Sequence, residues 1–250
     1  MRYDLTSVPE KYHSSRALTP ADVRRWVSLV QEVIQPEVGN SLIDLGCGTG
    51  RFTVPLAEQL GLPVIGIDPS QRMLREAKEN TSTPRITYRE GSAESIPLDT
   101  NSGALIFMSN AIHHVKNLDQ ALREMARVLQ PRGIVFLRNY SRQNLESLYY
   151  LQFFPEAIQI SVEMVWPRST LVERFTARSF VLLSQGTVHQ EASPDFEAYV
   201  RKIGSRVYSD LALIPDEAFH RGIARMKESC ASLSDGPVME DVDYFVFQKC

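Results

Sequence analysis

The stretch SLIDLGCGTGR, residues 41–51, places glycines at positions 46, 48 and 50 directly behind a short apolar run. This pattern predicts a buried strand followed by a tight turn, where missing side chains allow a ligand to touch the backbone. Asp44 lies inside the apolar run, and a buried carboxylate needs a positive or hydrogen-bond-donating partner. The stretch therefore predicts a ligand site at the carboxyl end of a strand.

Two common phosphate-binding motifs do not fit this stretch. A P-loop requires a lysine and a hydroxyl residue after its last glycine, but Gly50 is followed by Arg51 and Phe52. A dinucleotide-binding turn, counted from Gly46 and Gly48, requires a third glycine where Arg51 stands. A nicotinamide-dependent oxidoreductase therefore stays open only as an alternative.

Apolar runs and helical patterns alternate along the chain, which is typical of an α/β fold with a parallel sheet. The first helix starts after Thr19, which we expect to cap it, with Pro20 at its first position. We expect five strands at 42–45, 64–67, 86–88, 104–108 and 134–137, and helices at 51–60, 70–79 and 117–130. The segment 130–133 is expected to end the last of these helices and turn the chain into the fifth strand.

The regular alternation stops near residue 140. The segment 144–158 is predicted to be helical, 179–190 to be a strand, 194–230 to form two amphipathic helices, and 241–248 to be a final strand. The last two strands would form an antiparallel pair at the sheet edge. We therefore expect a doubly wound, mostly parallel seven-stranded sheet with an antiparallel last strand and helical lid additions.

Composition narrows the class of protein. The 250 residues, 43% of them hydrophobic, suit one domain with a lid, and 27 basic against 30 acidic residues give a net charge of -3. This charge predicts no nucleic-acid partner. Three distant cysteines and the lack of a signal peptide or an 18-residue apolar run predict a cytoplasmic protein without a membrane span or metal site.

Asp68 follows the second predicted strand and gives the ligand a second feature. The carboxyl ends of neighbouring parallel strands are where open α/β sheets bind ligands. A carboxylate there offers two acceptor oxygens, which match the vicinal hydroxyls of a ribose. Together Asp44 and Asp68 predict a ligand with an amino group and a ribose, without need of phosphate.

The motifs LIDLGCGTGR, VIGIDPSQRMLREAK, EGSAESIPL, SNAIHHVKN and ALREMARVLQPRGIVFL occur in this order in the sequence. Together they resemble the class I S-adenosylmethionine-dependent methyltransferases, in the small-molecule branch that includes the ubiquinone-biosynthesis type, over about residues 10–140. The resemblance implies a Rossmann-like methyltransferase fold, S-adenosylmethionine as cofactor and methyl transfer to a small organic acceptor.

The resemblance also implies a set of cofactor-binding residues. Asp44 and the backbone of Gly46–Gly48 would face the methionine part, Asp68 the ribose, and Asn110 the sulfonium. Ser92 stands where the family usually has an aspartate, so we expect the backbone near Ala93 to bind the adenine edge. The implied set is Tyr12, Arg16, Asp44, Gly46, Cys47, Gly48, Asp68, Pro69, Met73, Ser92, Ala93, Glu94 and Asn110.

Methyl transfer depends mainly on positioning, so a general base is optional. His113 and His114 follow the fourth predicted strand and are the candidate bases. The alternative is that they are polar residues at the rim of the cofactor cleft. His13, His189 and His220 are expected to be structural or solvated.

Several further side chains have two open interpretations. Five aromatic residues could contact an apolar acceptor or form the core of the lid: Tyr149, Tyr150, Phe153, Phe154 and Trp166. Four arginines could receive an acidic group or lie in solvent: Arg168, Arg174, Arg201 and Arg206. Cys47 is expected to be a small buried filler.

The segments expected to act together are an N-terminal arm and helix at 1–35, a cofactor-binding core at 40–140, and lid segments at 140–175 and 194–232 that select the acceptor. The sequence lacks the motifs of base and protein-arginine methyltransferases and the acidic cluster that would hold magnesium. A cofactor-binding protein without methyl transfer is the second hypothesis. A homodimer is one of the oligomeric states that the sequence allows.

Overall fold

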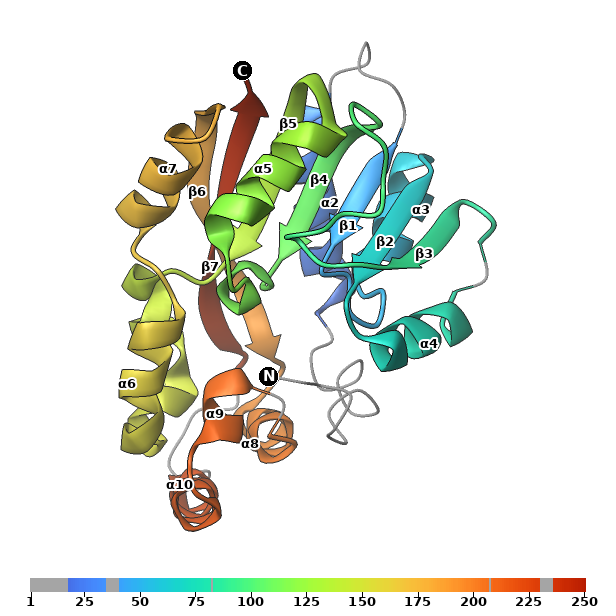
Figure 1. The fold of residues 1–250 in the computed structure, drawn as a ribbon. Coiled ribbons are helices and arrows are strands. Elements are labelled where there is room, and N and C mark those ends of the chain that lie inside the picture. The colour runs from blue at the N-terminus through green and yellow to red at the C-terminus, as the bar shows by residue number, and fades with distance from the viewer. Residues whose placement is uncertain (1–17, 35–40, 82, 207, 230–235) are drawn as a thin grey trace.

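The computed structural model describes residues 18–34, 41–81, 83–206, 208–229 and 236–250. Its strands form one seven-stranded sheet in the order β3-β2-β1-β4-β5-β7-β6 (Figure 1). The strands are β1 (Leu42–Leu45), β2 (Val64–Asp68), β3 (Ile86–Glu90), β4 (Gly103–Ser109), β5 (Leu129–Asn139), β6 (Phe180–Ser193) and β7 (Val238–Lys249).

The sheet is doubly wound about β1, which pairs in parallel with both β2 and β4. The strand order therefore reverses at β1, and ligands of such sheets bind at this reversal, outside the carboxyl ends of the strands. β7 runs antiparallel to both β5 and β6. The expected mostly parallel seven-stranded sheet with an antiparallel last strand is confirmed.

Helices cover both faces of the sheet because its strands are buried on both sides. Leu42 and Val64 belong to the apolar cluster that contains Trp26 of α2, whereas Ile43 and Leu45 belong to the cluster on the other face, which contains the buried residues of α5 and α7. α2 and α3 thus lie behind the sheet in Figure 1, and α5 lies in front of it. The helices around the sheet are α2 (Pro20–Val33), α3 (Thr53–Leu60), α4 (Gln71–Glu79), α5 (Leu118–Val128) and α7 (Arg168–Thr176).

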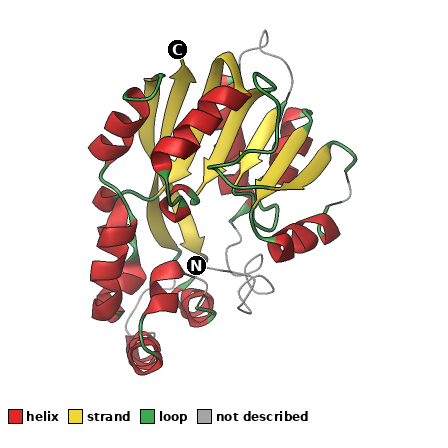
Figure 2. Cartoon of the chain, viewed as in Figure 1, coloured by secondary structure: helices red, strands yellow, loops and turns green. Residues whose placement is uncertain are grey.

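The remaining helices gather beyond the carboxyl ends of the parallel strands, where Figures 1 and 2 show them below the sheet. We call residues 142–164 and 196–229 the helical cover. Its elements are the short 3-10 helices η3 (Arg142–Ser147) and η4 (Tyr149–Phe153), followed by α6 (Pro155–Met164), α8 (Phe196–Gly204), α9 (Ser209–Leu213) and α10 (Asp216–Ser229).

Most of the local predictions are confirmed, and three are wrong. Thr19 caps α2 by accepting from the Asp22 amide at 3.1 Å. The predicted helix at 144–158 is instead two 3-10 helices and α6, because Pro155 takes the first position of a new helix. The segment 194–230 holds three helices rather than two, because Pro215 precedes a separate α10.

The third wrong prediction concerns β5, which begins at Leu129 and so includes the expected turn at 130–133. Leu129 pairs with Gly103 before a register shift, and regular pairing resumes at Ile134. Of the helices in the described ranges, none is long and apolar enough to cross a membrane.

A buried polar network joins α2 to the late strands. The Gln190 Oε1 atom accepts from Trp26 Nε1 at 2.8 Å and from Arg138 Nη2 at 2.9 Å. The Gln190 Nε2 atom donates to Glu240 Oε1 at 2.7 Å. Arg138, only 1% exposed, also lies over the Trp26 ring, with its guanidinium carbon 4.7 Å from the ring centroid. Gln190 is therefore the shared partner of three buried polar groups.

Replacing Gln190 by methionine should lower the free energy of unfolding by about 2 to 4 kcal/mol, because three buried polar groups each lose a partner. Urea unfolding followed by circular dichroism measures this change. Gln185→Met, on the exposed face of the same strand, is the control and should shift stability by less than about 0.5 kcal/mol. Equal effects of the two substitutions would contradict the role of the network.

Candidate active site

The glycine turn after β1 adopts the left-handed backbone that its residues allow. Gly46, Gly48 and Gly50 have φ values of 75°, 55° and 80°, a region that costs residues with a Cβ atom 1–2 kcal/mol or so. A Cβ built on Gly46 would lie 2.6 Å from the Cβ atom of Ala111. The turn therefore packs directly against the segment that follows β4.

Asp68 is fixed at the end of β2 by two backbone amides. Its Oδ2 atom accepts from the Gly48 amide and its Oδ1 atom from the Ser70 amide, both at 2.9 Å. A carboxylate accepts hydrogen bonds at both of its oxygens, and in Asp68 each oxygen accepts from one backbone amide. The side chain thus ties the glycine turn to the start of α4 and is held rigidly at the carboxyl edge of the sheet.

Asp44 is 2% exposed, and its Oδ2 atom accepts from the Thr53 hydroxyl at 2.6 Å. The pKa of Asp44 is raised from 3.8 to about 7, chiefly by burial and also by the negative charge of Asp68, against the opposing effects of the Thr53 hydrogen bond and the positive charge of Arg51. A positively charged ligand group beside Asp44 would favour the ionised form. The site thus has the electrostatic character of a receptor for a cation.

Glu94 is held by the segment that precedes α5. Its Oε1 atom accepts from the amides of Lys116 and Asn117 at 2.9 and 3.3 Å. Partial burial raises the pKa of Glu94, but hydrogen bonds from backbone amides outweigh burial and lower the pKa overall. The carboxylate therefore has a structural role, and its predicted contact with a cofactor stays a prediction.

The other predicted cofactor residues lie around this edge of the sheet. Met73 and Ala93 are buried, Pro69 is exposed, and Ser92 exchanges backbone hydrogen bonds with Ser95. Cys47 is buried, and desolvation raises the pKa of its thiol, as expected for an inert filler. Tyr12, Arg16 and His13 lie outside the described residues.

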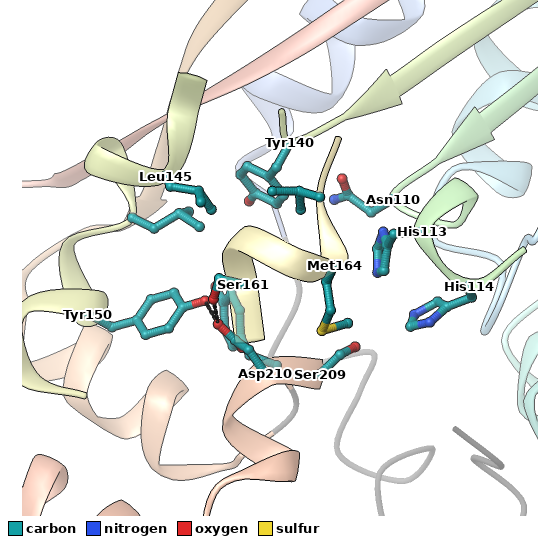
Figure 3. Close-up of a pocket in the computed structure, with 13 residues that line it drawn as sticks. Asn110, His113, His114, Tyr140, Leu145, Tyr150, Ser161, Met164, Ser209 and Asp210 are labelled. Atoms are coloured by element: carbon teal, nitrogen blue, oxygen red, sulfur yellow. Dashed lines mark hydrogen bonds between the residues drawn. The ribbon is translucent and has the colours of Figure 1, made fainter. Parts of the chain in front are cut away.

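A cleft opens between the end of β4 and the helical cover (Figure 3). It contains about 570 Å³ of empty space, including the part open to solvent. Its lining residues are Asn110, His113, His114, Tyr140, Leu145, Leu148, Tyr150, Ser161, Met164, Val165, Tyr208, Ser209 and Asp210. The segment 110–114 that forms one wall includes Ala111, so the cleft and the glycine turn are adjacent.

Asn110 has a φ of 49°, which is uncommon outside glycine, and its amide donates to the Arg138 carbonyl at 2.8 Å. Its Oδ1 atom is buried and accepts no hydrogen bond from the described residues. A buried acceptor without a partner costs free energy, so it indicates a site for a bound donor.

His113 and His114 lie in η2 (Ile112–His114), with ring centroids 4.0 Å apart. Both line the cleft, and Figure 3 shows the His113 ring beside Asn110. A base must lie within hydrogen-bond reach of the acceptor, and this wall is where such contact would occur. The position is compatible with both the catalytic and the rim interpretation.

The aromatic residues of the helical cover serve mostly as its core. Phe154 stacks on Phe219 with centroids 5.8 Å apart, and Tyr149 and Phe153 both pack against Phe196. Trp166 packs against the apolar cluster on the α5 face of the sheet. Tyr150 alone of the five predicted aromatics lines the cleft.

Two arginines that were candidate anion receptors are engaged elsewhere. Arg168 pairs with Asp243 at 2.7 Å, and Arg206 donates to the carbonyls of Leu211 and Ile214. Neither lines the cleft. The cleft-lining residues that the sequence did not indicate include Ser161 and Asp210, which α6 and α9 place opposite the histidines. The only feature of the sequence that could have indicated Asp210 is its carboxylate next to apolar residues in YSDLAL, residues 208–213.

A family model described as a methyltransferase domain matches residues 43–137. An uncharacterized methyltransferase of Mycobacterium bovis is 33% identical over 165 residues, which are 66% of this chain and 63% of the relative. Residues 43–137 of this chain form a methyltransferase domain. The resemblance seen in the sequence is thereby confirmed.

A demethylmenaquinone methyltransferase of Staphylococcus epidermidis is 32% identical to this methyltransferase-domain chain over 134 residues, 51% of the chain and 56% of the relative. The chain therefore spans less than two thirds of the length of these relatives. Class I methyltransferases use S-adenosylmethionine, so the family implies this cofactor.

Solved structures show the same fold. A protein from Anabaena variabilis, assigned as a methyltransferase of an antibiotic biosynthesis pathway, matches with a TM-score of 0.70 at 18% identity, covering 91% of this chain and 97% of that one. The cyclase SpnF matches with a TM-score of 0.66 at 18% identity, covering 99% and 93%. At this identity the likeness extends to the fold alone.

The substitution Asp44→Asn tests the raised pKa of Asp44 through the pH dependence of the free energy of unfolding. Because the folded-state pKa of about 7 exceeds the unfolded value of 3.8, the unfolded chain binds fewer protons between these values, and stability falls as pH rises through this window. The wild type, relative to Asp44→Asn, should lose about 2 to 3 kcal/mol of unfolding free energy between pH 5 and pH 8.

Urea unfolding at both pH values measures this loss in the ligand-free protein. Asp99→Asn, at an exposed position, is the control and should follow the wild type at both. A pH-independent difference between wild type and Asp44→Asn would show that Asp44 is already ionised or that its burial is relieved.

Proposed function

We propose that the protein transfers a methyl group from S-adenosylmethionine to a small organic acceptor. The observation that carries this proposal is the contact between the glycine turn and the wall of the cleft. Gly46 packs against Ala111, one residue from Asn110 and two from His113. A cofactor on the turn and an acceptor in the cleft would thus meet across a single layer of backbone.

The residues at the turn fit the chemistry of this cofactor. Asp44 is a buried carboxylate that a cationic ammonium group would stabilise in its ionised form. Asp68 places a carboxylate suited to ribose hydroxyls at the carboxyl edge of the sheet, and the Asn110 Oδ1 atom lacks a partner among the described residues. We propose that Gly46, Cys47 and Gly48 contribute backbone contacts, and that Tyr12, Arg16, Pro69, Met73, Ser92, Ala93 and Glu94 complete the site.

When bound, S-adenosylmethionine supplies a methyl group that its positive sulfur already activates for in-line displacement. The task of the chain is then to align the acceptor and exclude water, which can supply roughly 7 to 11 kcal/mol of the barrier. The helical cover would exclude water, and the apolar side of the cleft would hold the acceptor. We propose that His113, supported by His114, receives the proton that the acceptor gives up.

The second candidate function is cofactor binding without methyl transfer. The cyclase SpnF shares this fold, so the fold by itself does not imply methyl transfer. The two functions differ in one result, namely whether bound S-adenosylmethionine turns over to S-adenosylhomocysteine when acceptors are offered. The nicotinamide alternative predicts dinucleotide binding and is tested by the same titration.

Calorimetric titration with S-adenosylhomocysteine tests the cofactor assignment. The wild type should bind it, and Asp68→Ala should bind it about 100-fold more weakly, because two hydrogen bonds to a charged acceptor are lost. Asp99→Ala serves as the surface control, and thermal unfolding checks that Asp68→Ala is folded. Preference for a nicotinamide dinucleotide, or unchanged affinity in the variant, would overturn the assignment.

The double variant His113→Ala, His114→Ala tests the proposed base. With an acceptor found by screening, kcat should fall by about 10² to 10⁴, while the affinity for S-adenosylhomocysteine stays within about twofold of the wild type. Measuring kcat between pH 5 and pH 8 adds a second readout, because loss of a histidine base removes the decline toward low pH. Unchanged turnover would assign both histidines to the cleft rim.

A further inference from the structure

The far wall of the cleft contains a buried carboxylate that no step of methyl transfer requires. Asp210 of α9 is 6% exposed, and its Oδ2 atom accepts from the hydroxyls of Tyr150 and Ser161, each at 2.6 Å. Figure 3 shows these side chains meeting on the side of the cleft opposite Asn110 and His113. Three elements of the helical cover, η4, α6 and α9, therefore converge on one negative group.

The bonds to Asp210 leave acceptor capacity and uncompensated charge. Its Oδ1 atom accepts from the Leu211 amide at 2.8 Å, so three of about four acceptor positions are used in the described structure. All three donors are neutral. Among the described lining residues of the cleft there is no lysine or arginine, and the histidines stand on the opposite wall.

The opposite end of the cleft also presents an acceptor, the buried Asn110 Oδ1 atom. Between the two ends the lining is mainly apolar, with Leu145, Leu148 and Val165 contributing. Met164 points into the space between His113 and Ser209 in Figure 3. A flexible thioether at this place can adapt to the shape of a bound molecule.

We infer that the methyl acceptor is a largely apolar molecule whose hydrogen-bond donor, a hydroxyl or an ammonium group, binds Asp210. This inference rests on the proposed function, and it identifies the substrate class for the same site. Asp210 anchors one end of the acceptor, and the apolar body lies along Leu145 and Leu148. The other end then reaches the wall formed by Asn110 and His113.

The electrostatics of the cleft decide against an anionic acceptor. A carboxylate or phosphate placed near Asp210 would add like-charge repulsion in a partly buried site, with no arginine or lysine in the described lining to offset it. An ammonium group would instead gain from an opposite charge, and a hydroxyl would gain a charge-assisted hydrogen bond. The ammonium and the hydroxyl group both donate a hydrogen bond. The affinity of the ammonium group depends more strongly on the negative charge of Asp210.

The test uses three probes on one scaffold: phenol, benzylamine and benzoate. Binding to the protein saturated with S-adenosylhomocysteine is measured by ligand-observed NMR and titration. In methyl-labelled protein, broadening of the Met164 methyl resonance shows whether the probe occupies the cleft. Phenol or benzylamine should bind at least about tenfold more tightly than benzoate. If neither donor probe binds, or if benzoate binds as well as they do, the inference is wrong.

Two variants assign the effect to the carboxylate. Asp210→Asn should weaken the preferred donor probe by about tenfold or more, with the larger loss for benzylamine because the charge is removed. Tyr150→Phe, which frees one Asp210 acceptor position, should leave benzylamine bound, and it covers the case in which Asp210→Asn does not fold. Glu217→Gln, an exposed carboxylate of the same cover, should change nothing.

The outcomes separate the two levels of the proposal. Failure of the wild type to bind S-adenosylhomocysteine would contradict the proposed function. Two other outcomes would overturn only the anchoring role of Asp210. In the first, the protein binds S-adenosylhomocysteine but Asp210→Asn leaves the probe affinities unchanged. In the second, Tyr150→Phe weakens benzylamine binding as much as Asp210→Asn does.

Discussion

The close contact between Gly46 and Ala111 determines how the two halves of the site are related. A Cβ at position 46 would lie 2.6 Å from the Ala111 Cβ atom, and the φ of 75° at this residue adds a conformational cost for any other side chain. Glycine is therefore required both for the turn and for the approach of the segment after β4. Because of this contact, residues that follow β1 and β4 share one wall.

Buried charge is the second constraint on the molecule. Asp44 and Asp210 are both almost fully buried, and each accepts hydrogen bonds from hydroxyl groups of neighbouring elements, Thr53 for one and Tyr150 and Ser161 for the other. Removing a carboxylate from water costs free energy that hydrogen bonds from neutral hydroxyl groups offset only in part. The two carboxylates lie at the two places where the proposed function needs a ligand.

Local sequence patterns predicted the core of the fold well because each depends on neighbours within a few residues. The cap at Thr19 and the strands from β1 to β4 depend on side-chain spacing and turn chemistry, and they were found where expected. The errors lie where proline and tertiary packing override periodicity. Pro155 begins α6, Pro215 immediately precedes α10, and Leu129 joins β5 only because Gly103 is there to pair with it.

The sequence by itself determined the glycine turn, the positions of Asp44 and Asp68 at strand ends and the family to which the domain belongs, because these follow from residue types at fixed spacing. Only the tertiary structure decided which residues face the cleft. Ser161 and Asp210 are 49 residues apart, and their hydrogen bond arises from the packing of α6 against α9. The same packing buried Tyr150 at the wall of the cleft, where it is 2% exposed, and left Tyr149 partly buried against Phe196, since burial of one side chain rather than its neighbour depends on long-range contacts that no local pattern encodes.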